Sequence, residues 1–108
     1  MFITINGLKW QIRLSECNSD NLRRNDGSLT IGMTDKRTKT IYLCDKLKDA
    51  LIYNVLVHEL VHAFCFSFKI YLNIKEEEFL AEFISSYGKE IFDLTEEVLG
   101  GMIRKRIS

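Results

Sequence analysis

Alternating apolar and polar side chains near the start of the chain predict a β-hairpin over residues 2–14. Asn6-Gly7 is the strongest short hairpin-turn signal, and residues 8–14 after it alternate strictly. One face of that strand is apolar: Leu8, Trp10, Ile12 and Leu14. Residues 15–28 are polar and rich in turn formers, so we expect a loop there, with a helical turn around Leu22.

A second alternating segment predicts another hairpin. Residues 29–34 form an apolar and a polar face, 35–38 form a charged turn, and 39–43 return as the partner strand. Three basic residues lie at this turn, and we expect them to be solvated: Lys36, Arg37 and Lys39.

A long apolar segment over residues 47–68 contains neither glycine nor proline and predicts a helix. It is apolar nearly all round, which is typical of a buried helix. Asn73 and Glu76 match a capping box, which predicts a second helix reaching about Phe92. Asp93 and Glu96 match another, which predicts a short last helix broken or frayed at Gly100-Gly101.

This order, strands first and helices afterwards, predicts an α+β fold. We expect a single domain over residues 1–108, with a small antiparallel sheet of three to five strands packed on the helix of residues 47–68.

Composition narrows the functional class. The chain is 46% hydrophobic and 28% charged with a net charge of zero, so we expect a soluble protein that does not bind nucleic acid directly. Charged and polar residues interrupt each apolar run, so we expect no membrane span. Residues 1–5 lack the basic start of a signal peptide.

The chain contains three cysteines, Cys17, Cys44 and Cys65, at wide and irregular spacing. An odd count without a C-x-x-C pair favours reduced thiols and a cytoplasmic location over a disulfide framework. Cys65 follows the polar motif described next, and we interpret it as a small buried hydrophobe.

The only two histidines, His58 and His62, stand four residues apart inside the long apolar helix. Residues at this spacing share one helix face, so both imidazoles can bind one metal ion. Glu59 points about 100° away around the axis and can instead reach a water on that metal. This is the H-E-x-x-H pattern of two zinc ligands and a general base. The alternative is that both histidines are structural, in a metal-free domain.

A catalytic zinc takes three protein ligands and keeps one position open. The acidic residues that follow the motif are Glu76, Glu77, Glu78 and Glu82. Complementing the helix dipole accounts for Glu76 and Glu77. Glu78 and Glu82 lie one turn apart on one face, so we expect Glu78 to bind zinc and Glu82 to accept the ring N–H of a ligand histidine. The small Ala81 between them would let the two helices approach closely.

His58-Glu59-Leu60-Val61-His62, followed 16 residues after His62 by Glu78-x-x-Ala81-Glu82-Phe83, resembles the gluzincin metallopeptidases. The short length, the strand pair that ends with residues 40–43, and the helix–loop–helix order resemble the small ImmA/IrrE-type members of phages and mobile elements and related minimal gluzincins. The resemblance covers residues 29–92, although the Ala-Asn or Ala-Asp dipeptide usual after the glutamate in ImmA/IrrE members is missing.

The resemblance implies a zincin-like fold and a cytoplasmic Zn²⁺-dependent peptidase acting on a protein or peptide, such as a phage or mobile-element regulator. His58, His62 and Glu78 would bind zinc, and Glu59 would be the general base. The alternative is a zinc-binding but non-catalytic interaction module of the anti-repressor or inhibitor type. Small size favours this alternative, because it leaves little room for a deep substrate cleft.

Two further expectations concern the substrate. Tyr87 is a candidate for stabilising the oxyanion, with core packing as its alternative role. An extended substrate can add to a sheet edge, and the strand of residues 29–34 is the expected edge beside the motif helix. Gly32 would leave room there for another backbone, or would simply mark a bulge. The sequence leaves the oligomeric state open.

Overall fold

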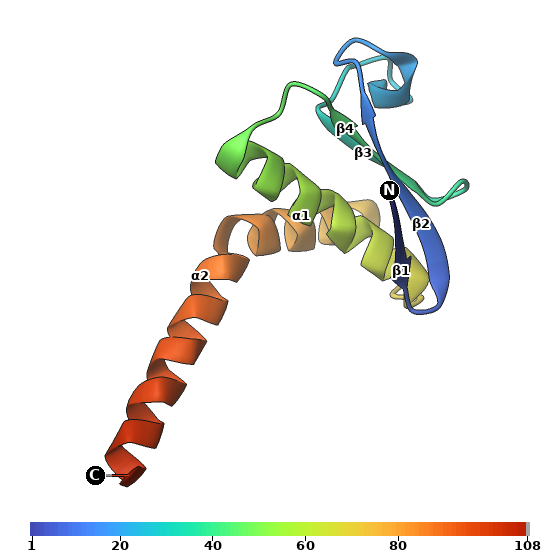
Figure 1. Cartoon of the computed structure of the whole chain (residues 1–108). Coiled ribbons are helices and arrows are strands. Elements are labelled where there is room, and N and C mark those ends of the chain that lie inside the picture. Colours follow the sequence, from blue (N-terminus) through green and yellow to red (C-terminus); the bar gives the residue numbers. More distant parts are fainter. Residues whose placement is uncertain (108) are drawn as a thin grey trace.

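The computed structural model describes residues 1–107, and at residues 106 and 107 only the backbone. It is an α+β arrangement of one four-stranded sheet and two helices (Figure 1). The strands are β1 (Phe2–Ile5), β2 (Leu8–Ser15), β3 (Gly32–Asp35) and β4 (Thr40–Cys44). The helices are α1 (Asp49–Ser67) and α2 (Ile74–Ile107), and a 3₁₀ turn, η1 (Asp20–Leu22), lies in the first long loop.

The N-terminal hairpin is confirmed. β1 and β2 pair antiparallel, with Ile3 opposite Trp10. Asn6 and Gly7 both have positive φ, 48° and 78°, as a type I′ turn requires. Trp10 is fully buried and its indole N–H donates a 2.8 Å hydrogen bond to Ser67 Oγ, which joins β2 to the end of α1.

The sheet is mixed, so the expectation of an antiparallel sheet is wrong. The strand order is β1-β2-β4-β3, and β2 pairs parallel with β4, with Ile12 opposite Ile41. β3 and β4 form the second expected hairpin, in which the returning strand lies inside and β3 lies at the edge. The loop after β2 carries the chain past the position of β4, and this longer-range crossover has no local sequence signal.

The ends of the predicted strands shift. β3 begins at Gly32, and Leu29 instead forms an isolated bridge with Arg23. Leu14, at the end of the alternating segment, is exposed. The helical turn around Leu22 is confirmed, and Leu22 is fully buried.

The core lies between the sheet and one side of α1. Its buried members are Ile5, Trp10, Ile41, Leu43 and Ala63. The expectation of a helix buried all round is wrong, since several large apolar side chains of α1 are exposed: Leu51, Tyr53, Phe64 and Phe66. By length and composition alone α1 could also cross a membrane, contrary to the sequence expectation, but the core helix of a soluble protein can have the same properties.

α2 is one continuous helix of 34 residues, so the predicted break before a short last helix is wrong. The first capping box is confirmed, because Asn73 Oδ1 accepts from the Glu76 N–H at 2.8 Å and Glu76 Oε1 accepts from the Asn73 N–H at 3.0 Å. The second box does not form. Asp93 instead pairs with Lys89 Nζ at 2.8 Å, one turn earlier, which is an interaction of a helix interior.

Cys17 and Cys44 form a disulfide, so the expectation of reduced thiols is wrong for this pair. The parallel pairing of β2 with β4 places Ser15 opposite Cys44, and the two cysteine Cα atoms lie 4.8 Å apart. Cys65 is free and buried, as expected.

Candidate metal centre

His58 and His62 lie one turn apart on α1 and face the first turns of α2. Their ring centroids are 5.1 Å apart, and their side chains are only 17% and 13% exposed. His58 Nε2 lies 3.3 Å from one Glu78 oxygen, and His62 Nε2 lies 2.8 Å from the other. One carboxylate of α2 therefore lies against the same ring nitrogen of both histidines.

This group has the donor set and the spacing of a metal site. One ligand atom each from His58, His62 and Glu78 lies within 4.8 Å of the other two. Ligands about 2.0–2.1 Å from a tetrahedral zinc are roughly 3.3 Å from one another, so the spacing fits a zinc ion after small side-chain adjustments. Two imidazoles and one carboxylate are also a ligand set of catalytic zinc.

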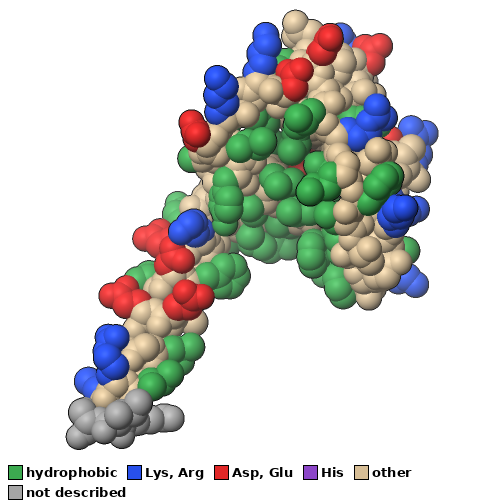
Figure 2. Space-filling view, in the orientation of Figure 1, with side chains coloured by type: hydrophobic (Ala, Val, Ile, Leu, Met, Phe, Trp, Pro, Cys, Tyr) green, Lys and Arg blue, Asp and Glu red, His purple; other side chains and the backbone are tan. Residues whose placement is uncertain are grey.

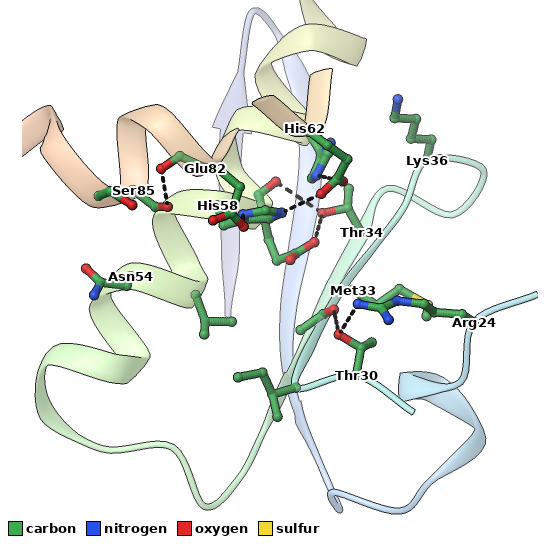
Figure 3. Close-up of a pocket in the computed structure, with 16 residues that line it drawn as sticks. Arg24, Thr30, Met33, Thr34, Lys36, Asn54, His58, His62, Glu82 and Ser85 are labelled. Atoms are coloured by element: carbon green, nitrogen blue, oxygen red, sulfur yellow. Dashed lines mark hydrogen bonds and ion pairs between the residues drawn. The ribbon is translucent and has the colours of Figure 1, made fainter. Parts of the chain in front are cut away.

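The other nitrogen of each ring has its own carboxylate. His58 Nδ1 lies 3.1 Å from Glu82 Oε1, which is the contact expected for Glu82. His62 Nδ1 lies 2.8 Å from Glu77 Oε1. Both nitrogens of each ring therefore face a carboxylate; with a metal ion on Nε2, the contacts of Glu82 and Glu77 would fix Nδ1 as the protonated nitrogen of each imidazole. Figure 3 shows His58, His62 and Glu82 brought together from the two helices.

Complementing the helix dipole does not fully describe Glu77. Its carboxylate is buried against His62 rather than exposed at the helix start. Lys36 Nζ donates to the same carboxylate at 3.0 Å, so Lys36 is not simply a solvated residue of the turn between β3 and β4. Burial alone would raise the pKa of Glu77, but the hydrogen bonds from His62 and Lys36 outweigh burial and lower it. Glu77 therefore remains a carboxylate beside His62.

Glu59 points from α1 toward β3. Thr34 Oγ1 donates a 2.9 Å hydrogen bond to its carboxylate, which is mostly buried. Burial raises the pKa of Glu59, and the Thr34 hydrogen bond opposes this shift only in part. A buried carboxyl of raised pKa, held in place and lining the same cavity as both histidines, has the properties of a general base.

Gly32 allows α1 to lie close against β3. A Cβ atom at this position would lie 2.6 Å from Val55 Cγ1 and 3.2 Å from Glu59 Cγ. The pairing of β3 with β4 is regular through Gly32, which lies opposite Leu43, so the residue does not mark a bulge. Its absent side chain makes room for Glu59 and for the helix that carries it.

A cleft of about 570 Å³ is lined by both histidines and by three of the carboxylates described above, Glu59, Glu78 and Glu82. One wall is formed by residues 30–34, which include most of β3, and the opposite wall includes Ser85 and Ser86 of α2. Small size therefore did not prevent a cleft. The edge position of β3 beside α1 is as predicted.

Tyr87 differs from expectation, and Arg24 is a cleft residue that the sequence did not indicate. Tyr87 does not line the cleft; it is exposed and packs on Phe83 with ring centroids 5.5 Å apart. Arg24 lines the cleft and donates to Thr30 Oγ1 at 3.2 Å (Figure 3). Arg24 comes from the loop after β2, and no local pattern in that loop indicates where it lies.

Cys17, Cys44 and Asp45 also lie close enough together to form a metal site. The two sulfur atoms are joined to each other, which removes them as thiolate ligands.

Comparison with family models, with curated proteins and with solved structures finds no match to this chain.

Proposed function

We propose that this protein is a zinc-dependent peptidase of the gluzincin type. The observation that carries the proposal is the convergence of His58 Nε2, His62 Nε2 and the Glu78 carboxylate, with Glu59 in the same cleft. We also propose that the fold is zincin-like and that the protein is related to the ImmA/IrrE-type members.

His58, His62 and Glu78 would hold the zinc, and all three line the cleft. When bound, zinc lowers the pKa of a coordinated water and polarises the substrate carbonyl. Glu82 and Glu77 would orient the two imidazoles by accepting their Nδ1–H groups.

Glu59 would move the proton. Its carboxylate accepts a proton from the attacking water as the water oxygen bonds to the carbonyl carbon, and then gives it to the amine nitrogen as the C–N bond breaks. Thr34 holds the carboxylate toward the cleft through its 2.9 Å hydrogen bond. The protein returns to its starting state with one water consumed and one peptide bond broken.

An extended substrate would lie along β3. This strand is one of the two edge strands of the sheet, and residues 30–34 line the same cleft as the metal-site residues. A peptide added to the edge would gain main-chain hydrogen bonds and pass close to Glu59. Such binding requires a flexible segment, and the resemblance favours a segment of a cytoplasmic phage or mobile-element regulator.

The experiment compares the wild type with Glu59→Gln. Both proteins are purified without added zinc, their zinc content is measured by mass spectrometry, and cleavage of a quenched-fluorescent peptide library is followed. Loss of a general base costs roughly 10²–10⁴ in rate, so Glu59→Gln should keep its zinc and lose at least that much activity. Glu90→Gln, an exposed acid far along α2, is the matched control and should behave as the wild type. Equal cleavage by wild type and Glu59→Gln would refute the mechanism.

A non-catalytic zinc-binding module remains the second candidate. The extensive apolar surface exposed on α1 and α2 favours it, because such surfaces commonly mark protein interaction sites. The same experiment separates the two candidates: a wild type that holds zinc but cleaves no peptide supports the interaction module.

A further inference from the structure

α2 changes its surroundings after Gly88. α2 packs on α1, and its buried positions, which include Ala81 and Gly88, all lie at or before Gly88 in the part whose burial is described. From Lys89 to Leu99 every residue is exposed. Figure 1 shows this second half projecting away from the sheet and α1. We refer to residues 89–105 as the α2 tail.

The α2 tail is strongly amphipathic. At 100° per residue its large apolar side chains cover one half of the helix circumference, and its acidic residues lie on the other half. These apolar side chains are between 43% and 67% exposed: Ile91, Phe92, Leu94, Val98, Leu99, Met102 and Ile103. Figure 2 shows apolar side chains exposed along the tail. An exposed apolar face adds no packing energy to a helix, and most helical stability in proteins comes from such packing.

The chain exposes more surface than a folded monomer of its mass. A 12.6 kDa globular protein exposes about 6,200 Å², whereas this chain exposes 8102 Å². Its radius of gyration is 16.8 Å, against about 13 Å for a compact chain of this length. The excess of roughly 1,900 Å² is more than the ~800 Å² that each partner buries in a standard interface. The uncovered surface is therefore large enough for a stable dimer.

The distribution of charge along the tail favours a second copy of the tail as its partner, in antiparallel orientation. Four acids lie within residues 90–97, and Arg104 and Lys105 lie at the other end. Two tails that run antiparallel bring the acidic part of each beside the basic end of the other. Parallel tails would bring like charges together. A helix on an anionic membrane carries mainly basic residues beside its apolar face, and the acidic part of this tail is the opposite.

We propose that the α2 tails of two copies of this chain pair antiparallel through their apolar faces and form a homodimer. The pairing would place the Leu94 region of one tail against the Met102 region of the other. It requires neither zinc nor catalysis, so it goes beyond the proposed peptidase function.

The first test is the mass of the zinc-loaded full chain in solution, measured by light scattering during size-exclusion chromatography. The wild type should have a mass of about 25 kDa, twice that of the 12.6 kDa chain. The double variant Leu94→Glu/Val98→Glu should be a monomer with unchanged zinc content. The control Tyr71→Glu/Ile74→Glu makes the same change at two exposed apolar residues outside the tail and should remain a dimer.

The second test fixes the direction. Arg104→Glu/Lys105→Glu places acid beside acid in an antiparallel pair and should weaken dimerisation by at least about tenfold. The triple variant Glu90→Lys/Asp93→Lys/Glu97→Lys should dissociate in the same way. An equimolar mixture of the two variants should restore the dimer mass, which also shows that both variants are folded.

Three results would overturn the proposal. The first is a monomeric wild type, including one that binds lipid vesicles instead. The second is a dimer that persists when Leu94 and Val98 are both replaced by glutamate. The third is a dimer unaffected by Arg104→Glu/Lys105→Glu, which would indicate parallel tails or another interface.

Discussion

The two histidines of the candidate metal centre are oriented by the same chemical group in two different environments. At the His62 end, Glu77 has a side chain only 10% exposed and a second partner in Lys36. At the His58 end, the Glu82 side chain is 69% exposed. The more buried carboxylate is also the closer one: Glu77 lies 2.8 Å from His62 Nδ1, and Glu82 lies 3.1 Å from His58 Nδ1.

This difference matters because solvent weakens ion pairs. A charge-assisted hydrogen bond shielded from water is strong and geometrically restrictive, whereas an exposed pair contributes roughly 0–1 kcal/mol. The comparison therefore predicts a rigid ligand at His62 and a more mobile one at His58. Glu78 lies against both histidines, so it should matter more to metal binding than either orienting carboxylate.

Glu78→Ala should have the largest effect. Among the described residues, Glu78 supplies the one carboxylate that contacts Nε2 of both histidines, so its loss should lower zinc affinity by more than the ~100-fold typical of an orienting partner. Zinc affinity would be measured by competition with a chromophoric chelator, with Glu82→Ala as the matched control. If Glu82→Ala lost zinc while Glu78→Ala kept it, the roles of the two residues would be exchanged.

Glu77→Gln should have the next largest effect. It keeps the size of the side chain but removes the charge that accepts from His62 Nδ1 and Lys36 Nζ. Zinc affinity should fall by about 10–100-fold, the usual cost of losing a histidine-orienting group. Lys36→Gln leaves the His62 contact in place and should cost less. A Glu77→Gln protein that binds zinc as tightly as the wild type would contradict the proposed rigidity of the His62 end.

Gly32→Ala tests the support of Glu59 rather than either histidine. The added methyl would lie 2.6 Å from Val55 Cγ1, so β3 and α1 must separate, and the free energy of unfolding should fall by about 1–3 kcal/mol. Urea denaturation measures this change. Gly100→Ala is a matched control, because the added methyl would meet Arg104 Nη1 only at 3.9 Å, an ordinary contact distance, and it should stabilise α2 slightly. Equal stability of Gly32→Ala and the wild type would mean that α1 does not need this close approach.

Glu82→Gln should have the smallest effect. Its carboxylate is largely exposed, so its loss should reduce zinc affinity by only about two- to fivefold. The same competition assay checks this, and the ratio to Glu77→Gln is the informative number. A larger loss for Glu82→Gln than for Glu77→Gln would reverse the comparison between the two ends.

Local patterns predicted the parts of this fold that depend on local physics. The Asn6-Gly7 turn needs positive φ at two consecutive residues, and the sequence supplies residues that tolerate it. The spacing of His58 and His62 places both rings on one face of any helix. The same reasoning applies to Glu78 and Glu82 on α2.

The features that the sequence did not predict depend on contacts between segments far apart in the chain. Glu77 and Lys36 meet only because the turn between β3 and β4 lies over the start of α2, and no periodicity reports that placement. The parallel pairing of β2 with β4 depends on a long connection, and it also brings Cys17 to Cys44. The second capping box was ambiguous, because Asp93 can begin a helix or pair with Lys89 inside one.

The most direct test of the central claim is a zinc anomalous-difference map from a crystal of the zinc-loaded protein. We predict one strong peak about 2.0–2.2 Å from His58 Nε2, His62 Nε2 and a Glu78 oxygen, with Glu77 and Glu82 still in contact with the Nδ1 atoms. A peak at Cys17, Cys44 and Asp45, or a zinc bound by Glu82 in place of Glu78, would contradict it.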